Sequence, residues 1–150
     1  MRIRAFIAGV AFLFVSSVSM ADLTPWEDFE VSDAVYSVTT VKVDSNMGNA
    51  YLEGLRDTWI PGNKIAKELG QLESWAIYRS DLPESGDFNL ILVVKFANTS
   101  DLAPNKAAYD EFMAKYTKEA SDAATDYSQK NYPAMRELTG QYQMREITIK

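Results

Sequence analysis

The sequence predicts an α+β domain in which two helices cover one face of a four-stranded antiparallel sheet. Stretches with strand character and stretches with helical spacing follow one another in the order strand, helix, strand, strand, helix, strand. The third strand is apolar on both of its alternating faces, which is typical of a strand in the middle of a sheet. The chain of 150 residues has no cysteine, so a hydrophobic core must hold the fold without disulfides.

The first strand and the first helix come at the start of this domain. Residues 35–43, VYSVTTVKV, are rich in β-branched side chains and lack helical spacing, so they predict a strand. Asp44, Ser45 or Asn46 is expected to cap the helix that follows, and Gly70 is a natural stop after it. The apolar stripe of this helix recurs every three or four residues and consists of Leu52, Leu55, Trp59, Gly62, Ala66 and Leu69.

A proline and a glycine interrupt this helix beside a tryptophan. Pro61 has no backbone N–H and its ring clashes with the carbonyl of Asp57, so a kink is expected there. Gly62 falls on the apolar stripe and would let the bent helix approach the sheet closely, with Trp59 in the core between them. The alternative is a hinge that gates a ligand, and the structural explanation is the favoured one.

The second and third strands follow the first helix. Residues 72–79, LESWAIYR, predict the second strand, and residues 88–96, FNLILVVKF, predict the third. Between them, residues 80–87 contain the proline and glycine that a chain reversal needs.

A long second helix and a fourth strand complete the domain. Residues 98–105 are expected to cap the helix, Pro133 to begin a short helical turn that ends near Gly140, and residues 142–150 to form the strand. With right-handed crossovers, this order gives the ferredoxin-like plan, in which the first and third strands are central. A second copy of the chain, packed sheet to sheet, is the expected cover for the free face. The stripe of the second helix consists of Tyr109, Phe112, Met113, Tyr116, Ala120, Ala123 and Tyr127.

The domain organisation begins with a predicted signal peptide at residues 1–21. A basic start, an apolar run too short to span a membrane, and small residues before a cleavage site after Ala21 predict export to the periplasm or the medium. Residues 22–34 form an acidic N-terminal arm, and residues 35–150 form the ferredoxin-like domain. No later apolar run reaches the roughly 20 residues that a membrane span needs, so no membrane insertion is expected after cleavage.

Composition excludes several classes of partner and chemistry. The net charge is −6, and removal of Arg2 and Arg4 with the signal peptide takes it to −8, which argues against nucleic acid as a partner. The chain has neither histidine nor cysteine, which removes most zinc, copper and haem ligands as well as nucleophilic triads that need either residue. We therefore predict no metal site, no cofactor and no identifiable catalytic residue.

A pattern of aromatic and breaker residues, W-x-P followed by G-x-x-x-x-W-x-x-Y-R, resembles the dimeric α/β-barrel superfamily. Its nearest likeness is to exported members related to the antibiotic-biosynthesis-monooxygenase-like and NIPSNAP-like groups, over about residues 35–150. The resemblance implies a homodimeric barrel. The superfamily includes cofactor-free oxygenases, lactone isomerases and members without known activity, and its haem branches use a histidine that this chain lacks. The residues that carry the pattern are Trp59, Pro61, Gly70, Trp75, Tyr78 and Arg79.

The second strand carries the candidate ligand site. Small Ser74 and Ala76 suit the face under the helices, so Trp75 and Arg79 on the opposite face are expected to line the barrel interior. A tryptophan wall with one cation suits a flat or carboxylated organic ligand. The alternative is that Trp75 fills the dimer interface and Arg79 pairs with a carboxylate at its rim. The predicted ligand-binding set is Glu73, Trp75, Ile77, Arg79 and Lys95.

Other polar residues on the strands have a less specific interpretation. Lys42, Lys95, Arg145 and Glu146 can form a buried ion pair or a proton-transfer pair if two of them share the interior face. More often such residues lie near strand ends or reach water, and that explanation is favoured. The tyrosines of the second helix are expected in the core, with their hydroxyls at the surface.

Three functions are compatible with these residues. The favoured one is an exported homodimer that binds a small apolar or aromatic molecule without catalysing a reaction, because no clear acid–base pair is present. The alternative is a cofactor-independent oxygenase or isomerase, which would use Arg79, Tyr78 and Lys95 to stabilise developing charge. The third is an envelope interaction protein that makes its contact through Trp26 and Phe29 of the arm.

Overall fold

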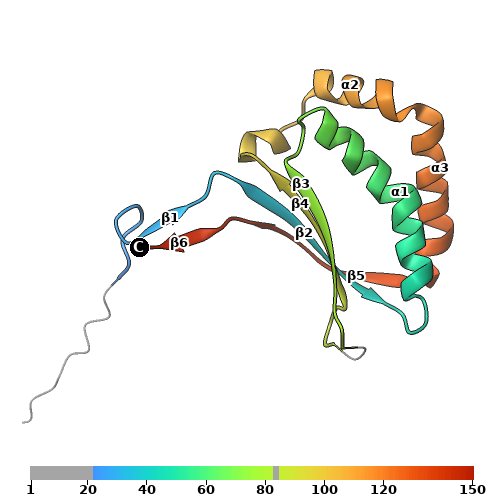
Figure 1. Ribbon diagram of the computed structural model, residues 1–150, viewed down its shortest axis with the longest axis horizontal. Helices are drawn as coiled ribbons and strands as arrows, with labels where there is room; N and C mark the ends of the chain where they lie inside the picture. The colour runs from blue at the N-terminus through green and yellow to red at the C-terminus, as the bar shows by residue number, and fades with distance from the viewer. Residues whose placement is uncertain (1–21, 83–84) are drawn as a thin grey trace, which may run out of the picture.

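The sheet of the computed structural model, which describes residues 22–82 and 85–150, has the strand order expected of a ferredoxin-like fold. Four antiparallel strands lie in the order β3-β4-β2-β5, so the two central strands are the predicted first and third ones (Figure 1). The predicted fold class is therefore confirmed. The strands are β2 (Val35–Val43), β3 (Ser74–Arg79), β4 (Leu90–Phe96) and β5 (Arg136–Met144).

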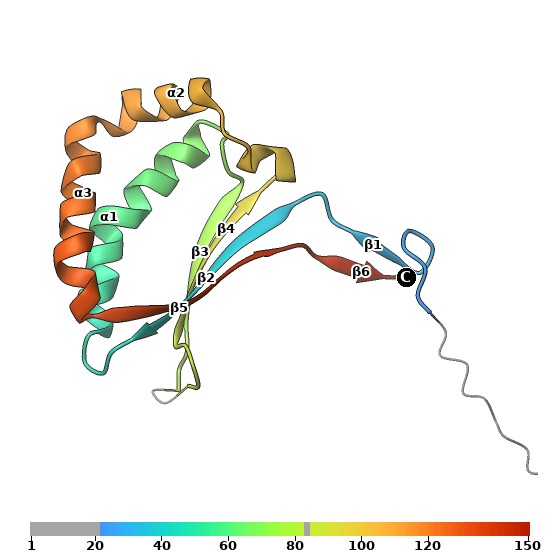
Figure 2. The same cartoon turned by 180° about the vertical axis from the view of Figure 1, so that it is seen from behind.

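Three helices lie on the same side of this sheet, with α2 across the end of α1, as Figure 2 shows from behind. They are α1 (Gly48–Glu68), α2 (Lys106–Tyr116) and α3 (Lys118–Asn131), and a 3-10 turn, η1 (Thr99–Leu102), precedes α2. The predicted second helix is thus two helices, because the chain turns sharply at Thr117, whose φ is 60°. That conformation is costly for a β-branched residue. The Thr117 hydroxyl accepts a bond from the Ala120 amide and so caps α3.

The core fills the layer between α1 and the sheet. Tyr51 and Leu55 of α1 pack on Val41, Leu90 and Leu92 of the two central strands, and all five are buried. Trp59 was predicted in this core, and it packs against the cluster while only partly buried. Placing the most apolar strands under the helix stripe removes the largest apolar area from water.

Of the two helix breakers in α1, the glycine has a different role from the expected one. The helix continues through Pro61, although this residue cannot donate a hydrogen bond to Asp57. A Cβ added at Gly62 would meet Phe112 of α2 at an ordinary 3.7 Å and would meet no strand, so the expected close approach to the sheet was wrong. The tight contact is at Gly54 instead, where an added Cβ would lie 2.9 Å from the rings of Tyr127 and Tyr132.

Two predicted boundaries were also wrong, whereas Gly70 ends α1 with a φ of 70°, as expected. The N-cap of α1 is Met47, and no side chain caps this end, so Asp44, Ser45 and Asn46 do not have the predicted role. The turn at Pro133, η2 (Tyr132–Ala134), is three residues long, and β5 begins only two residues later. The fourth strand of the sheet is therefore Arg136–Met144 rather than residues 142–150.

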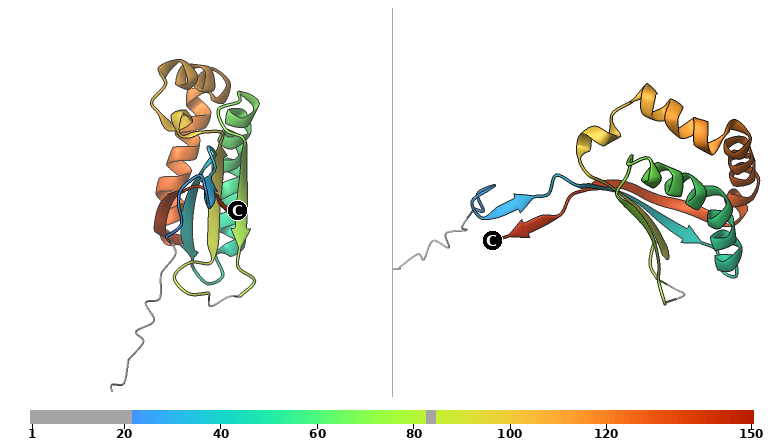
Figure 3. Two further views of the ribbon diagram at one scale, coloured as in Figure 1. Left: turned by 90° about the vertical axis from the view of Figure 1, so that its left-hand side faces the viewer. Right: turned by 45° about the horizontal axis from the view of Figure 1, so that its top comes forward.

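The ends of the described chain pair with each other outside the four-stranded sheet. β1 (Phe29–Val31) from the predicted arm and β6 (Ile147–Ile149) form an antiparallel ribbon that projects from the body of the domain (Figure 3). The predicted signal peptide, residues 1–21, lies outside the described residues.

No described residue of the single chain covers the face of the sheet opposite the helices. We call it the open face. Its side chains stand in rows across the strands, because residues in register share a face. It consists of Tyr36, Val38, Thr40, Ser74, Ala76, Tyr78, Ile91, Val93, Tyr142 and Met144, together with Lys95 at one end.

Candidate functional site

The structure places the predicted tryptophan under the helices rather than on the open face. The Trp75 ring packs edge to face against Trp59 of α1, with ring centroids 5.6 Å apart. Ile77 pairs in register with Leu92 and joins the same core. The face expected for this strand was therefore wrong, and small Ser74 and Ala76 lie on the open face. Two aromatic rings that pack together bury more apolar area than alanine or serine beneath a helix, which explains the choice.

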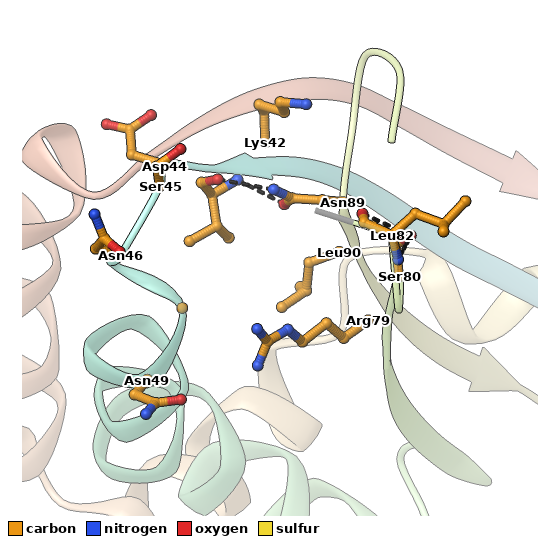
Figure 4. Close-up of a pocket in the computed structure, with 12 residues that line it drawn as sticks. Lys42, Asp44, Ser45, Asn46, Asn49, Arg79, Ser80, Leu82, Asn89 and Leu90 are labelled. Carbon is orange, nitrogen blue, oxygen red and sulfur yellow. Dashed lines mark hydrogen bonds between the residues drawn. The ribbon is translucent and has the colours of Figure 1, made fainter. Parts of the chain in front are cut away.

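Arg79 points into a polar cleft at the beginning of α1 (Figure 4). The cleft holds about 660 Å³ and is lined by the β2–α1 connection, the first turn of α1 and the β3–β4 connection, with Asn46, Asn49 and Ser80 among the lining residues. The guanidinium lies about 3.4 Å from the position that a Cβ on Gly48 would take, so a larger residue would crowd it. Asn89 lies beside the cleft and holds β2 through bonds to the amide and carbonyl of Val43.

The remaining predicted site residues form an ion pair at the end of the open face. Lys95 lies 2.6 Å from a Glu73 carboxylate oxygen and 5.8 Å from the ring centre of Tyr36. The hydrogen bond to Glu73 raises the pKa of Lys95. Lys95 and Tyr78 thus belong to the open face and Arg79 to the polar cleft, so the structure does not bring these three residues together. Whether any of the five predicted residues binds a ligand stays a prediction.

A second pocket lies between α1, α3 and the sheet, and we call it the tyrosine pocket. It holds about 400 Å³, within the range typical of small-molecule sites. Tyr51 and Thr58 lie on the same face of α1, two helical turns apart. Tyr132 of η2 and Arg136 of β5 come from near the other end of the chain. Its principal lining residues are Tyr51, Thr58, Tyr116, Ser128, Tyr132 and Arg136.

Hydrogen bonds and ring contacts fix most of these side chains. The hydroxyls of Thr58 and Tyr132 are 2.6 Å apart, and the Tyr116 hydroxyl donates to the Thr58 carbonyl oxygen at 3.3 Å. The Arg136 guanidinium lies 4.9 Å from the ring centre of Tyr132 and 5.5 Å from that of Tyr51. Cation–π contacts of this kind hold the guanidinium at the pocket wall.

Two buried polar atoms of the pocket have no hydrogen-bond partner among the described residues. They are the hydroxyl oxygen of Tyr51 and Nε of Arg136. No carboxylate in residues 22–82 or 85–150 lies within ion-pair distance of Arg136. Of the described residues that line the pocket, Arg136 is the one with a charge. Buried polar atoms are rarely left unsatisfied, so this pair points to a missing acceptor.

Burial raises the pKa of two tyrosine hydroxyls in this pocket. Loss of solvation raises the pKa of Tyr51 to about 12, an effect that the nearby Arg136 charge partly offsets. Burial also raises the pKa of Tyr132, and the Thr58 hydrogen bond partly opposes that shift. At neutral pH the pocket therefore presents one cation and neutral hydroxyl donors, a combination that favours a negatively charged oxygen.

Sequence reasoning missed the two central residues of this pocket. Tyr51, Leu55 and Thr58 recur at helical spacing, so the sequence pattern could have predicted that Tyr51 lies on the buried face of the helix, next to the stripe that starts at Leu52. Arg136 was hidden because the fourth strand was predicted to start six residues too late. Of the helix tyrosines predicted in the core, Tyr116 and Tyr127 are half-buried, whereas Tyr109 is 62% exposed.

Comparison with known proteins adds structural likenesses of low identity. HapK from Hahella chejuensis is 12% identical, with a TM-score of 0.45 over 75% of this chain and 91% of its own. A NIPSNAP family protein with unknown function from Agrobacterium tumefaciens is 16% identical, with a TM-score of 0.44 over 78% and 89%. A dimeric protein of unknown function and ferredoxin-like fold from Bacteroides fragilis is 10% identical, with a TM-score of 0.38 over 81% and 100%. With scores below 0.5, the fold class rests on the strand order of the chain itself.

The sequence matches no protein-family model and no curated protein. In the described ranges, no cluster of three or more acidic side chains is arranged to hold a metal ion. No helix within those ranges is long and apolar enough to cross a membrane.

Proposed function

We propose that the protein binds a small aromatic molecule that carries an anionic oxygen, and that it does so in the tyrosine pocket. The observation that supports this proposal is Arg136, which has no ion-pair partner among the described residues, beside the buried Tyr51 hydroxyl, which has no hydrogen-bond partner among them. A carboxylate, phenolate or enolate oxygen would supply the acceptor that both groups lack. The aromatic walls and the volume of about 400 Å³ suit a ligand of one or two rings.

The proposal includes a homodimer and an exported protein. A second copy on the open face would cover the exposed rings of Tyr78 and Tyr142, which a lone domain leaves in water. Export rests on the signal-peptide pattern of residues 1–21. Cell fractionation followed by intact mass measurement tests it, because cleavage after Ala21 leaves a chain that begins at Asp22. A full-length cytoplasmic chain would contradict it.

Calorimetric titration with 1-naphthoate, and with the uncharged 1-naphthamide as the matched probe, tests the ligand class. We expect the carboxylate to bind and the amide to bind at least tenfold more weakly, because one charge-assisted hydrogen bond contributes about 1.5–3 kcal/mol. Equal affinities for the two compounds would contradict a site built for an anion.

Two arginine variants locate the site. Arg136→Gln is expected to weaken naphthoate binding at least tenfold, while Arg79→Gln in the polar cleft is expected to leave it unchanged. Circular dichroism verifies that both variants are folded. The reverse result would place the ligand at Arg79 and overturn the assignment to the tyrosine pocket.

A second candidate is a cofactor-independent oxygenase or isomerase that uses the same pocket. The specific observation is that a cation and neutral hydroxyls stand together, where they can stabilise an oxyanion that develops during a reaction. Oxygen uptake and isomerisation assays with quinol-type and lactone substrates test this candidate. Turnover that Arg136→Gln removes would favour it over binding alone, and absence of turnover would favour binding.

A further inference from the structure

The ribbon formed by β1 and β6 has one apolar side and one polar side. Phe29 pairs with Ile149, and Val31 pairs with Ile147, so these four side chains share one side. Glu30 and Thr148 pair on the other side. The apolar side is open to water, since Val31, Ile147 and Ile149 are 41%, 57% and 62% exposed.

Such a ribbon needs a partner to be stable. Within the described chain, β1 and β6 form a sheet only with each other. An isolated two-stranded ribbon is marginally stable in water, because it buries too little apolar surface to offset the lost chain entropy. The ribbon joins the larger sheet at one end only, so the two exposed isoleucines on its apolar side are expected to be covered.

We propose that a second copy of this chain covers the apolar side of the ribbon, as part of the same interface that covers the open face. The ribbon continues the pairing of β2 with β5, because the Ser32 amide donates to the Glu146 carbonyl oxygen at 2.9 Å between the two ladders. It leaves the sheet on the side away from the helices, which is the side of the open face (Figures 1 and 3). A copy seated on the open face therefore lies next to the ribbon.

The size of the open face supports this arrangement. Four strands about 4.8 Å apart and about seven residues long, at about 3.3 Å per residue, give a flat footprint of roughly 440 Å². A stable interface of standard size buries about 800 Å² on each partner. The ribbon supplies further apolar area, and in a two-fold dimer each copy contributes both its ribbon and its open face. This inference rests on the homodimer of the proposed function.

Sedimentation velocity over a concentration series of the purified protein tests the role of the ribbon. The double variant Ile147→Glu/Ile149→Glu places charges on the apolar side, and Thr148→Glu, on the polar side of the same strand, is the matched control. Val93→Glu disturbs the open face itself. We expect a wild-type dimer whose dissociation constant rises at least tenfold in the double variant and in Val93→Glu, with no change in Thr148→Glu.

The possible outcomes separate this inference from the homodimer. If Val93→Glu dissociates the dimer while the double variant keeps the wild-type dissociation constant, the homodimer stands and the ribbon has no part in it. A wild-type monomer overturns both. If that monomer instead floats with phosphatidylglycerol vesicles through the same two isoleucines, a lipid surface is the occupant and the inference fails.

Discussion

At the scale of single residues, the tyrosine pocket is unusual because two of its buried polar atoms find no acceptor among the described residues. Arg136 is held by two aromatic rings instead of a carboxylate, and the Tyr51 hydroxyl is buried with no partner in the described part of the chain. Each unsatisfied buried group costs about 1–3 kcal/mol. The sequence therefore retains an arrangement that reduces stability in the ligand-free protein, which is typical of binding sites.

The cost at Tyr51 can be measured directly. Tyr51→Phe keeps the ring in the core and removes the hydroxyl, so we expect it to raise the free energy of unfolding by about 1 kcal/mol. Tyr132→Phe is the matched control, since it breaks the 2.6 Å hydrogen bond to Thr58 and is expected to lower that free energy by about 1 kcal/mol. Urea unfolding compares the two. A loss of stability in Tyr51→Phe would show that its hydroxyl has a partner.

Tyr51 also predicts a dependence of stability on alkaline pH. Its pKa is raised from 10.0 to about 12 by burial, so between these values the unfolded chain loses the proton while the folded protein keeps it. The free energy of unfolding should therefore fall as pH rises from about 10 to about 12, and Tyr51 should contribute no such change below about pH 9. In Tyr51→Phe, the free energy of unfolding should fall less steeply over this pH range. The same change at exposed Tyr109 should not, and equal slopes in the two variants would contradict the prediction.

At the scale of elements, the closest approach of α1 to its neighbours occurs at a glycine other than the one beside Pro61. Gly54 lies under the rings of Tyr127 and Tyr132, whereas Gly62 has an ordinary contact with Phe112. The two glycines share one helix, so a substitution at each has the same effect on helix propensity. Any difference between the two substitutions in the free energy of unfolding therefore comes from packing alone.

We therefore expect opposite effects from alanine at the two glycines. Gly54→Ala drives a methyl group into contacts of 2.9 Å and should lower the free energy of unfolding by about 1–3 kcal/mol. Gly62→Ala should raise it by about 0.5–1 kcal/mol, because alanine loses less backbone entropy in a helix. Thermal and urea unfolding measure both. Similar effects at the two positions would mean that α3 shifts to accommodate the methyl group.

At the scale of the whole molecule, the open face and the ribbon make the stability of the protein depend on its concentration. If a dimer forms through them, a tenfold increase in concentration should raise the melting temperature by about 2–3 °C, because association stabilises the folded state by mass action. Val93→Glu should melt at a temperature that does not change with concentration. A wild-type melting temperature that is equally constant would indicate a monomer.

The local elements were determined by the sequence itself. The β-branched run of residues 35–43 and the helical spacing before Gly70 placed a strand and a helix correctly, and their order led to the ferredoxin-like sheet. Alternation and helical spacing are local properties, so they could be read without knowing what packs against them. The same local pattern marked β4 as a central strand.

Only the tertiary structure decided which face of β3 lies under the helices and which residues meet in the pocket. Alternation gives two faces but does not tell them apart, and here the contact of Trp75 with Trp59 decides against the small residues. Tyr51 and Arg136 are 85 positions apart in the sequence, so no spacing rule connects them. Their proximity follows from the pairing of β5 with β2 and from the packing of α1 on that sheet, which depend on the apolar area buried by the whole chain.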